Sequence, residues 1–90
     1  MNIKITQTAK EQIMKVVTAP DQFMKVDLVK SGCCSMAFTL YKDIKRGDDT
    51  MVEVDGLNIL VTPRAKMALA AGTIDYKRRG LSKAFTVTAG

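Results

Sequence analysis

The feature of the sequence that most restricts its fold is a pair of alternating segments that meet at two adjacent cysteines. Apolar side chains recur at every second position from Met24 to Leu28 and again from Met36 to Leu40, which is the period of a β-strand with one buried face. Between the two segments lies Ser31-Gly32-Cys33-Cys34. Glycine reaches the positive φ angles of a tight turn without steric cost, so the pattern predicts two strands joined by a turn that carries both cysteines.

Cys33 and Cys34 are the two cysteines of the chain, which contains no histidine. A disulfide between them is disfavoured, because neighbouring Cα atoms lie about 3.8 Å apart whereas bridged cysteines need roughly 4.4–6.8 Å. Two interpretations remain: a thiolate pair for a soft metal or an iron–sulfur cluster, or two small buried residues. Because the turn carries the thiols towards solvent, we favour Cys33 and Cys34 as metal and cofactor ligands.

The N-terminal part predicts a short strand followed by a helix. Thr8 and Glu11 fit a capping box at the start of the helix, with Thr6 as the alternative cap. Apolar residues then recur at helical spacing. Because proline cannot continue a helix, Pro20 should end this one by about Ala19.

The second half predicts a hairpin, a second helix and two strands. Asp55-Gly56 between two apolar segments is typical of a β-hairpin turn. The helix that follows has Thr62 as its cap, Pro63 in its first turn and Gly72 at its C-terminal end. Beyond it, apolar and polar residues predict two further strands, over residues 73–76 and 84–88.

The order of predicted elements is β-α-β-β-β-β-α-β-β, which is an α+β fold rich in strands. The 90 residues, of which 47% are hydrophobic, suit a single domain over residues 1–90. No apolar run approaches the roughly 20 residues of a membrane span, and the N-terminus lacks the layout of a secretory signal. Adjacent cysteines are not a disulfide framework, so we expect a reducing, cytoplasmic location.

The net charge of +5 is concentrated most sharply at Lys77-Arg78-Arg79, with Lys83 close behind. We interpret this segment as a solvated strand end and turn, with an acidic partner or a phosphate group as the functional alternative. Tyr76 is the only aromatic residue within it, so binding to nucleic acid is not expected. We interpret Asp48 and Asp49 as part of a solvated turn and not as a site for Mg²⁺ or Ca²⁺, because such a site needs further oxygen ligands.

Several motifs together resemble a known family. Ser31-Gly32-Cys33 is followed by Met36-Ala37-Phe38-Thr39-Leu40, and the Asp-Gly hairpin and short helix lead to Gly72-Thr73-Ile74-Asp75-Tyr76, with Gly80-Leu81 before Ala84-Phe85. This combination, which spans nearly the whole chain, resembles the HesB/IscA-like (A-type) iron–sulfur cluster biosynthesis domain. The resemblance implies a HesB-like fold of mixed β-sheets with two short helices.

Members of that family typically bind iron or an iron–sulfur cluster through three cysteines, one in the Ser-Gly-Cys turn and two in a Cys-Gly-Cys tail. Cys33 matches the first position, whereas Cys34 stands where the family usually has a small residue, and this sequence ends at Gly90 without the tail pair. The resemblance therefore implies a short variant with a Cys-Cys pair. Since a cluster usually takes four thiolates, a homodimer would supply them as Cys33 and Cys34 of each protomer.

The expected function is non-enzymatic: binding of iron, a [2Fe–2S] cluster or another soft metal, and its delivery to apoproteins or cluster-assembly proteins. Two alternatives stay open. Thiol redox or thiol transfer would use the strained, reducible pair, with Lys30 nearby to favour the thiolate. A partner-binding module that has lost metal binding would instead dock through Lys77-Arg78-Arg79.

Overall fold

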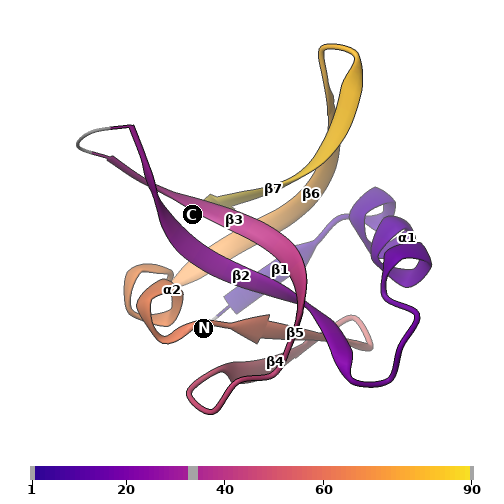
Figure 1. Cartoon of the computed structure of the whole chain (residues 1–90). Helices are drawn as coiled ribbons and strands as arrows, with labels where there is room; N and C mark the ends of the chain where they lie inside the picture. The colour runs from indigo at the N-terminus through magenta and orange to yellow at the C-terminus, as the bar shows by residue number, and fades with distance from the viewer. Residues whose placement is uncertain (1, 33–34, 90) are drawn as a thin grey trace.

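The computed structural model describes residues 2–32 and 35–89. The predicted ligands Cys33 and Cys34 therefore lie outside the described residues. The helices and strands follow in the order β1 (Asn2–Ile5), α1 (Gln7–Val16), β2 (Gln22–Ser31), β3 (Ser35–Ile44), β4 (Thr50–Val54), β5 (Leu57–Val61), α2 (Pro63–Ala68), β6 (Ala71–Arg79) and β7 (Ser82–Ala89). This order confirms the predicted one (Figure 1).

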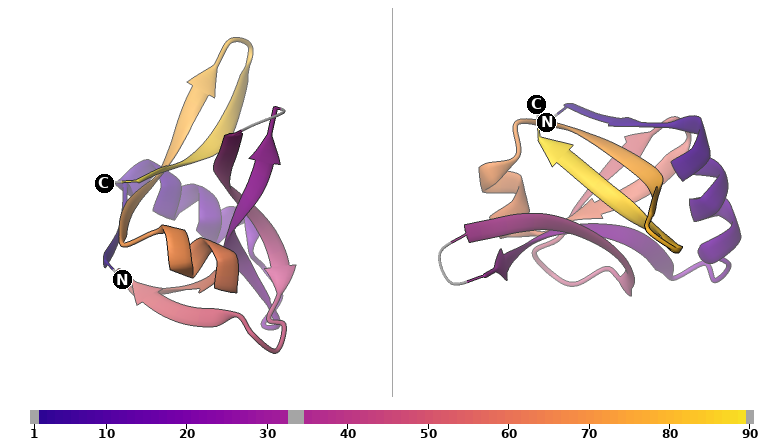
Figure 2. Two further views of the ribbon diagram at one scale, coloured as in Figure 1. Left: turned by 90° about the vertical axis from the view of Figure 1, so that its left-hand side faces the viewer. Right: turned by 90° about the horizontal axis from the view of Figure 1, so that it is seen from above.

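The strands form two mixed sheets. The larger sheet has the strand order β3-β2-β5-β4, and the smaller one has the order β1-β6-β7. β2 and β5 pair in parallel, as do β1 and β6, whereas the other pairs are antiparallel. The fold is thus α+β, rich in strands and mixed in its sheets, as predicted; Figure 2 shows the helices at its periphery.

One hydrophobic core joins the two sheets and both helices. Its buried apolar residues come from strands of both sheets and from one face of each helix; they are Ile3, Ala9, Ile13, Met24, Val26, Leu40, Val54, Ile59, Val61, Ala65, Leu69 and Ile74. None of them is aromatic, because the sequence has few aromatic residues and no tryptophan. The core therefore forms from shape-complementary branched and small side chains.

The first helix begins earlier than the favoured prediction. Thr6 is its N-cap and accepts a hydrogen bond from the Ala9 backbone N–H at 3.2 Å. The alternative prediction of Thr6 as the cap is therefore confirmed, and the prediction of Thr8 is wrong. Thr6 also donates to Asp75 Oδ1 on β6 at 2.7 Å, a long-range contact that no capping-box pattern contains. The helix ends at Val16, before Pro20 as predicted, and the residues between them lead into β2.

The predicted hairpin turn is confirmed, but the predicted role of Gly72 is wrong. Asp55 and Gly56 both have positive φ angles, 50° and 81°, as a two-residue turn of mirror type requires. Gly72 lies within β6 instead of closing α2, which ends at Ala68. A Cβ atom at Gly72 would lie 3.1 Å from Leu69 Cδ1. The glycine lets the buried leucine pack closely against the strand backbone, and a larger residue there would push the Leu69 side chain aside.

The middle of strand β2, predicted to be half-buried, is buried on both faces over residues 24–27. Lys25 and Asp27, which alternate with its apolar residues, are only 1% and 4% exposed. Asp49, predicted to be solvated, is also buried and forms an ion pair with Lys25 at 2.7 Å. The prediction failed because β2 is a central strand of its sheet, and its outer face is covered by charged groups from distant segments.

Candidate functional site

The candidate site lies at the outer end of the hairpin formed by β2 and β3. Its ladder continues from Gln22 opposite Ile44 to Ser31 opposite Ser35, so three positions, 32–34, connect the strands. Gly32 has a φ angle of 74°, which a residue with a side chain rarely adopts. The two predicted strands are therefore confirmed, and Gly32 has the backbone conformation predicted for the turn between them. The role of Cys33 and Cys34 as ligands stays a prediction.

The hairpin projects from the body of the protein, because its apolar pattern ends before its strands do. Leu28 and Phe38 face each other and pack against the core. The next residues on the same face, Lys30 and Met36, also face each other but are exposed, Met36 by 55%. The outer part of the β2–β3 hairpin extends beyond the rest of its sheet in Figure 1 and in the left view of Figure 2. This end of the hairpin is accessible to a second molecule.

A second hairpin, β6–β7, rises on the same side of the protein and diverges from the first (Figures 1 and 2). Tyr76 and Phe85 pair across it with ring centroids 4.8 Å apart, and both pack against the core. Beyond them Arg78 stands opposite Lys83. Leu81, in the turn, is 99% exposed. The prediction of a solvated strand end and turn at this basic segment is confirmed.

A groove of about 530 Å³ lies between the bases of the two hairpins. Ala37, Phe38 and Thr39 of β3 form one wall, and residues 85–88 of β7 form the other. Each of these strands is at the edge of its sheet. The groove therefore lies between the two hairpins, with β3 on one side and β7 on the other.

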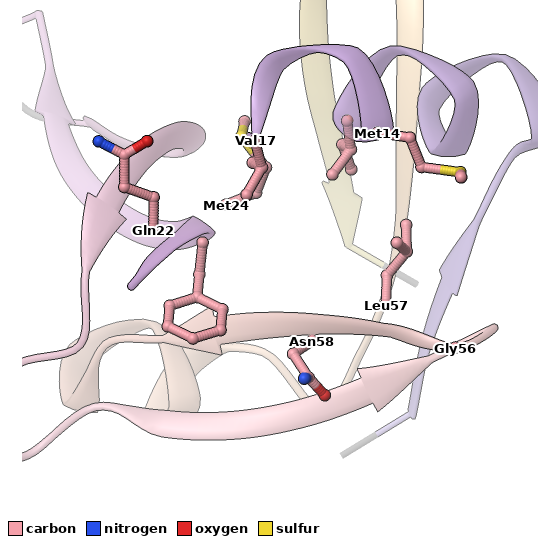
Figure 3. Close-up of a pocket in the computed structure, with 9 residues that line it drawn as sticks. Met14, Val17, Gln22, Met24, Gly56, Leu57 and Asn58 are labelled. Atoms are coloured by element: carbon pink, nitrogen blue, oxygen red, sulfur yellow. The ribbon is translucent and has the colours of Figure 1, made fainter. Parts of the chain in front are cut away.

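A separate hollow of about 370 Å³ lies between α1 and the turn that joins β4 to β5 (Figure 3). Met14, Val17, Met24 and Leu57 contribute to its apolar lining, and Gln22 and Asn58 stand at its rim. None of its lining residues carries an ionisable group. The hollow therefore lacks the groups needed for acid–base chemistry.

The metal-binding prediction continues to rest on the cysteines. Across residues 2–32 and 35–89, no group of three or more histidine, cysteine, aspartate or glutamate side chains is arranged to hold a metal ion. The buried carboxylates that the structure does describe already have cationic partners: Asp49 contacts Lys25, and Asp27 contacts Arg64. In the same part of the chain, no helix is long and apolar enough to cross a membrane.

Sequence reasoning missed how the charged residues of the two hairpins are arranged. Lys30 on one hairpin, and Arg78 with Lys83 on the other, continue the faces that pack on the core. The basic residues were visible as a run, but their shared face depends on the strand register. Counting every second residue outward from Leu28 and Tyr76 would have placed Lys30 and Arg78 on these faces. The position of Lys83 depends on the pairing of β6 with β7.

The family of the chain follows from its whole length. A model of the family described as "Iron-sulphur cluster biosynthesis" matches residues 1–90. The chain belongs to this family, so the resemblance read from its motifs is confirmed.

Individual relatives agree with that assignment. The chain is 29% identical to the iron–sulfur cluster insertion protein ErpA of Aeromonas salmonicida, over 96% of this chain and 78% of the relative. It is 25% identical to the iron-binding protein IscA of Photorhabdus laumondii, over 94% of this chain and 82% of the relative. Its fold is similar to that of Escherichia coli SufA, with a TM-score of 0.77 at 22% identity, covering 96% of this chain and 78% of the other.

Proposed function

We propose that the protein binds iron or an iron–sulfur cluster through the thiolates of Cys33 and Cys34 and passes it to apoproteins or cluster-assembly proteins. The observation that supports this proposal is the β2–β3 ladder, whose last described pair is Ser31 opposite Ser35; in the sequence, the cysteine pair lies between these two serines. Support comes from the family match and from relatives named for iron binding and cluster insertion. The role is that of a carrier, in which no covalent bond of a substrate is made or broken.

The number of thiols favours a homodimer as the loaded form. The chain has two cysteines, and a [2Fe–2S] cluster usually takes four thiolates. A two-fold axis near the hairpin ends would bring Cys33 and Cys34 of both protomers together. Each protomer would act as a single domain over residues 1–90. A reducing cytoplasm would suit this chemistry, because the thiols must stay reduced to bind metal.

The proposal is tested by anaerobic reconstitution with iron and sulfide. The wild type should develop the visible absorption of a cluster and shift in native mass from monomer to dimer. The double variant Cys33→Ser/Cys34→Ser should stay colourless and monomeric, and each single variant should lose most of the bound iron. Measuring iron and labile sulfide per chain would separate a cluster from a mononuclear iron site.

Leu81→Ser is the matched control, because Leu81 is an exposed turn residue of the other hairpin. This variant should bind as much iron and sulfide as the wild type. Equal binding by the double cysteine variant would contradict the proposed ligands. A colourless wild-type monomer whose thiols react freely would contradict cluster binding altogether.

A further inference from the structure

We propose that the inner faces of hairpins β2–β3 and β6–β7 form a cationic docking surface for an acidic patch on a partner protein. We call this the inter-hairpin surface; it consists of Lys30, Met36, Arg78, Leu81 and Lys83. This inference rests on the proposed function in one respect: the partner is taken to be a protein that gives or receives the iron or cluster.

The strand register places the cations of each hairpin on the face that packs against the core nearer its base. Ile74 and Tyr76 on β6 face the core, and Arg78 is the next residue with the same orientation. Lys83 stands directly opposite Arg78. On the other hairpin, Lys30 follows Leu28 in the same way. The faces that form the core at the bases of the hairpins thus become cationic where the hairpins extend beyond it.

The cations of the inter-hairpin surface have no anionic partner in the described part of the chain. Lys30, Arg78 and Lys83 are all exposed, and no ion pair involves them among residues 2–32 and 35–89. Like charges directly opposite each other destabilise an antiparallel pair. The Arg78–Lys83 pair therefore costs the hairpin stability when the protein is alone, and an anionic partner would reverse that effect.

The chemistry of the surface favours a protein partner. Single-stranded nucleic acid is bound by basic grooves with free aromatic rings, but Tyr76 and Phe85 stack on each other at 4.8 Å and are partly buried. Leu81 instead offers an exposed apolar side chain beside the cations, a combination suited to a protein surface. A second copy of the chain is disfavoured as the molecule bound at Arg78 and Lys83, because both copies carry a net charge of +5 and the same cationic pair. The proposed homodimer would instead form at the ends of the β2–β3 hairpins.

The test uses the apoprotein and a short fluorescent peptide rich in glutamate with one central leucine. Fluorescence anisotropy should show binding that weakens on the order of tenfold between about 50 and 300 mM salt. Arg78→Glu/Lys83→Glu should weaken binding on the order of tenfold or more. Backbone amide shifts on titration should map to residues 76–85 and to Lys30 and Met36 on the other hairpin. Lys83→Glu alone retains the hairpin by placing opposite charges across it, and should weaken binding by about threefold.

The matched control is Lys42→Glu/Lys45→Glu, which makes the same change in net charge. Lys42 and Lys45 are exposed and lie at the opposite end of β3 from the turn. This control should bind within about threefold of the wild type. Equal weakening by the two double variants would overturn the proposal, since only net charge would then matter. Tighter binding of an oligothymidylate of the same charge would also overturn it in favour of nucleic acid.

These measurements separate the inference from the proposed function. Peptide binding is measured without iron, and cluster binding is measured without the peptide. Loss of cluster binding in the wild type would leave the inter-hairpin surface standing as a docking site. Loss of peptide binding, with a cluster still formed, would remove the docking surface alone.

Discussion

The outer face of β2 and the inter-hairpin surface both carry charged residues, but only those on β2 are paired. The side chains of Lys25 and Asp27 are 2% and 5% exposed, and each contacts several oppositely charged or polar groups. Arg78 and Lys83 are exposed and face each other with like charge. Position in the sheet, and not charge itself, therefore decides whether an ionic residue stabilises the fold or is available for recognition.

The Lys25 contacts join three segments of the larger sheet. Its Nζ donates to Asp43 at 3.1 Å and to the Ile44 carbonyl at 2.9 Å, and it forms an ion pair with Asp49 at 2.7 Å. Burial opposes the charged form, but the hydrogen bonds to Asp49 and Asp43 outweigh it and raise the pKa of Lys25. The lysine therefore stays charged and holds the end of β3 and the following loop against β2.

The Asp27 contacts join β2 to the start of α2. Its carboxylate accepts two hydrogen bonds from Arg64, at 2.8 and 2.9 Å, and others from the hydroxyls of Thr62 and Tyr41. The Arg64 hydrogen bonds are the largest cause that holds the pKa of Asp27 far below its ordinary value, against the opposing effect of burial. The base of the β2–β3 hairpin is thereby fastened to the helix, while its outer end remains accessible.

The largest effect is expected from Lys25→Met. The substitution keeps the aliphatic stem but leaves Asp49 and Asp43 without their cation, so it should lower the free energy of unfolding by about 3 kcal/mol or more. Urea denaturation followed by circular dichroism measures the loss. Lys42→Met, at an exposed position opposite Met24, should change the free energy of unfolding by less than about 0.5 kcal/mol. A loss at Lys25 as small as this would erase the contrast between buried and exposed charges.

A smaller effect, with a distinctive pH dependence, is expected from Asp27→Asn. The variant should lose about 2 kcal/mol at neutral pH, because hydrogen bonds to a charged group are replaced by weaker ones. Since the pKa of Asp27 is lowered on folding, its contribution is present above the unfolded pKa of about 3.9 and is lost as the pH falls through the folded value. Wild-type stability should therefore fall in acid more steeply than that of Asp27→Asn.

Urea denaturation at a series of pH values below about 5 measures this difference in slope. Part of the slope should remain in the variant, because the pKa values of Asp43, Asp49 and Asp75 are also lowered. Asp48→Asn is the control, since Asp48 is exposed and has no ion pair within the described ranges. Parallel profiles for the wild type and Asp27→Asn would contradict the role of this carboxylate.

The smallest effect, opposite in sign, is expected from Lys83→Glu. Replacing a like-charge pair with an attractive one across β6–β7 should raise the midpoint of thermal unfolding by about 1–4 °C. Differential scanning calorimetry at low salt measures the shift, which should shrink at high salt. The same variant weakens peptide binding, so stability and recognition should move in opposite directions. A lower midpoint would show that the cationic pair already has a structural role.

Much of the fold could be predicted from local patterns. The order of strands and helices, the Asp55-Gly56 turn and the Thr62-Pro63 helix start each depend on neighbouring residues, and the structure has them. Errors arose where a distant segment decided the outcome. Thr6 is the cap that also reaches Asp75, and Gly72 accommodates Leu69 instead of ending a helix.

The candidate site shows the same division. The hairpin, its glycine turn and the family were readable from residues 24–40 and the motifs after them, because alternation and turn chemistry are local properties. The pairing of Arg78 with Lys83 was not readable, since it depends on the register of β6 against β7. The ligand role of Cys33 and Cys34 remains a prediction for reconstitution to test.

Local patterns in the chain were enough to predict the succession of elements, the two strands that flank the cysteines and membership of the family. Which charges are buried depended on long-range packing. Lys25 and Asp27 look like ordinary solvent-facing residues of an alternating strand, yet β2 became a central strand with groups from the β3–β4 loop and α2 packed over it. The physical reason is that alternation distinguishes the two faces of a strand, whereas burial of each face depends on what the rest of the chain places upon it.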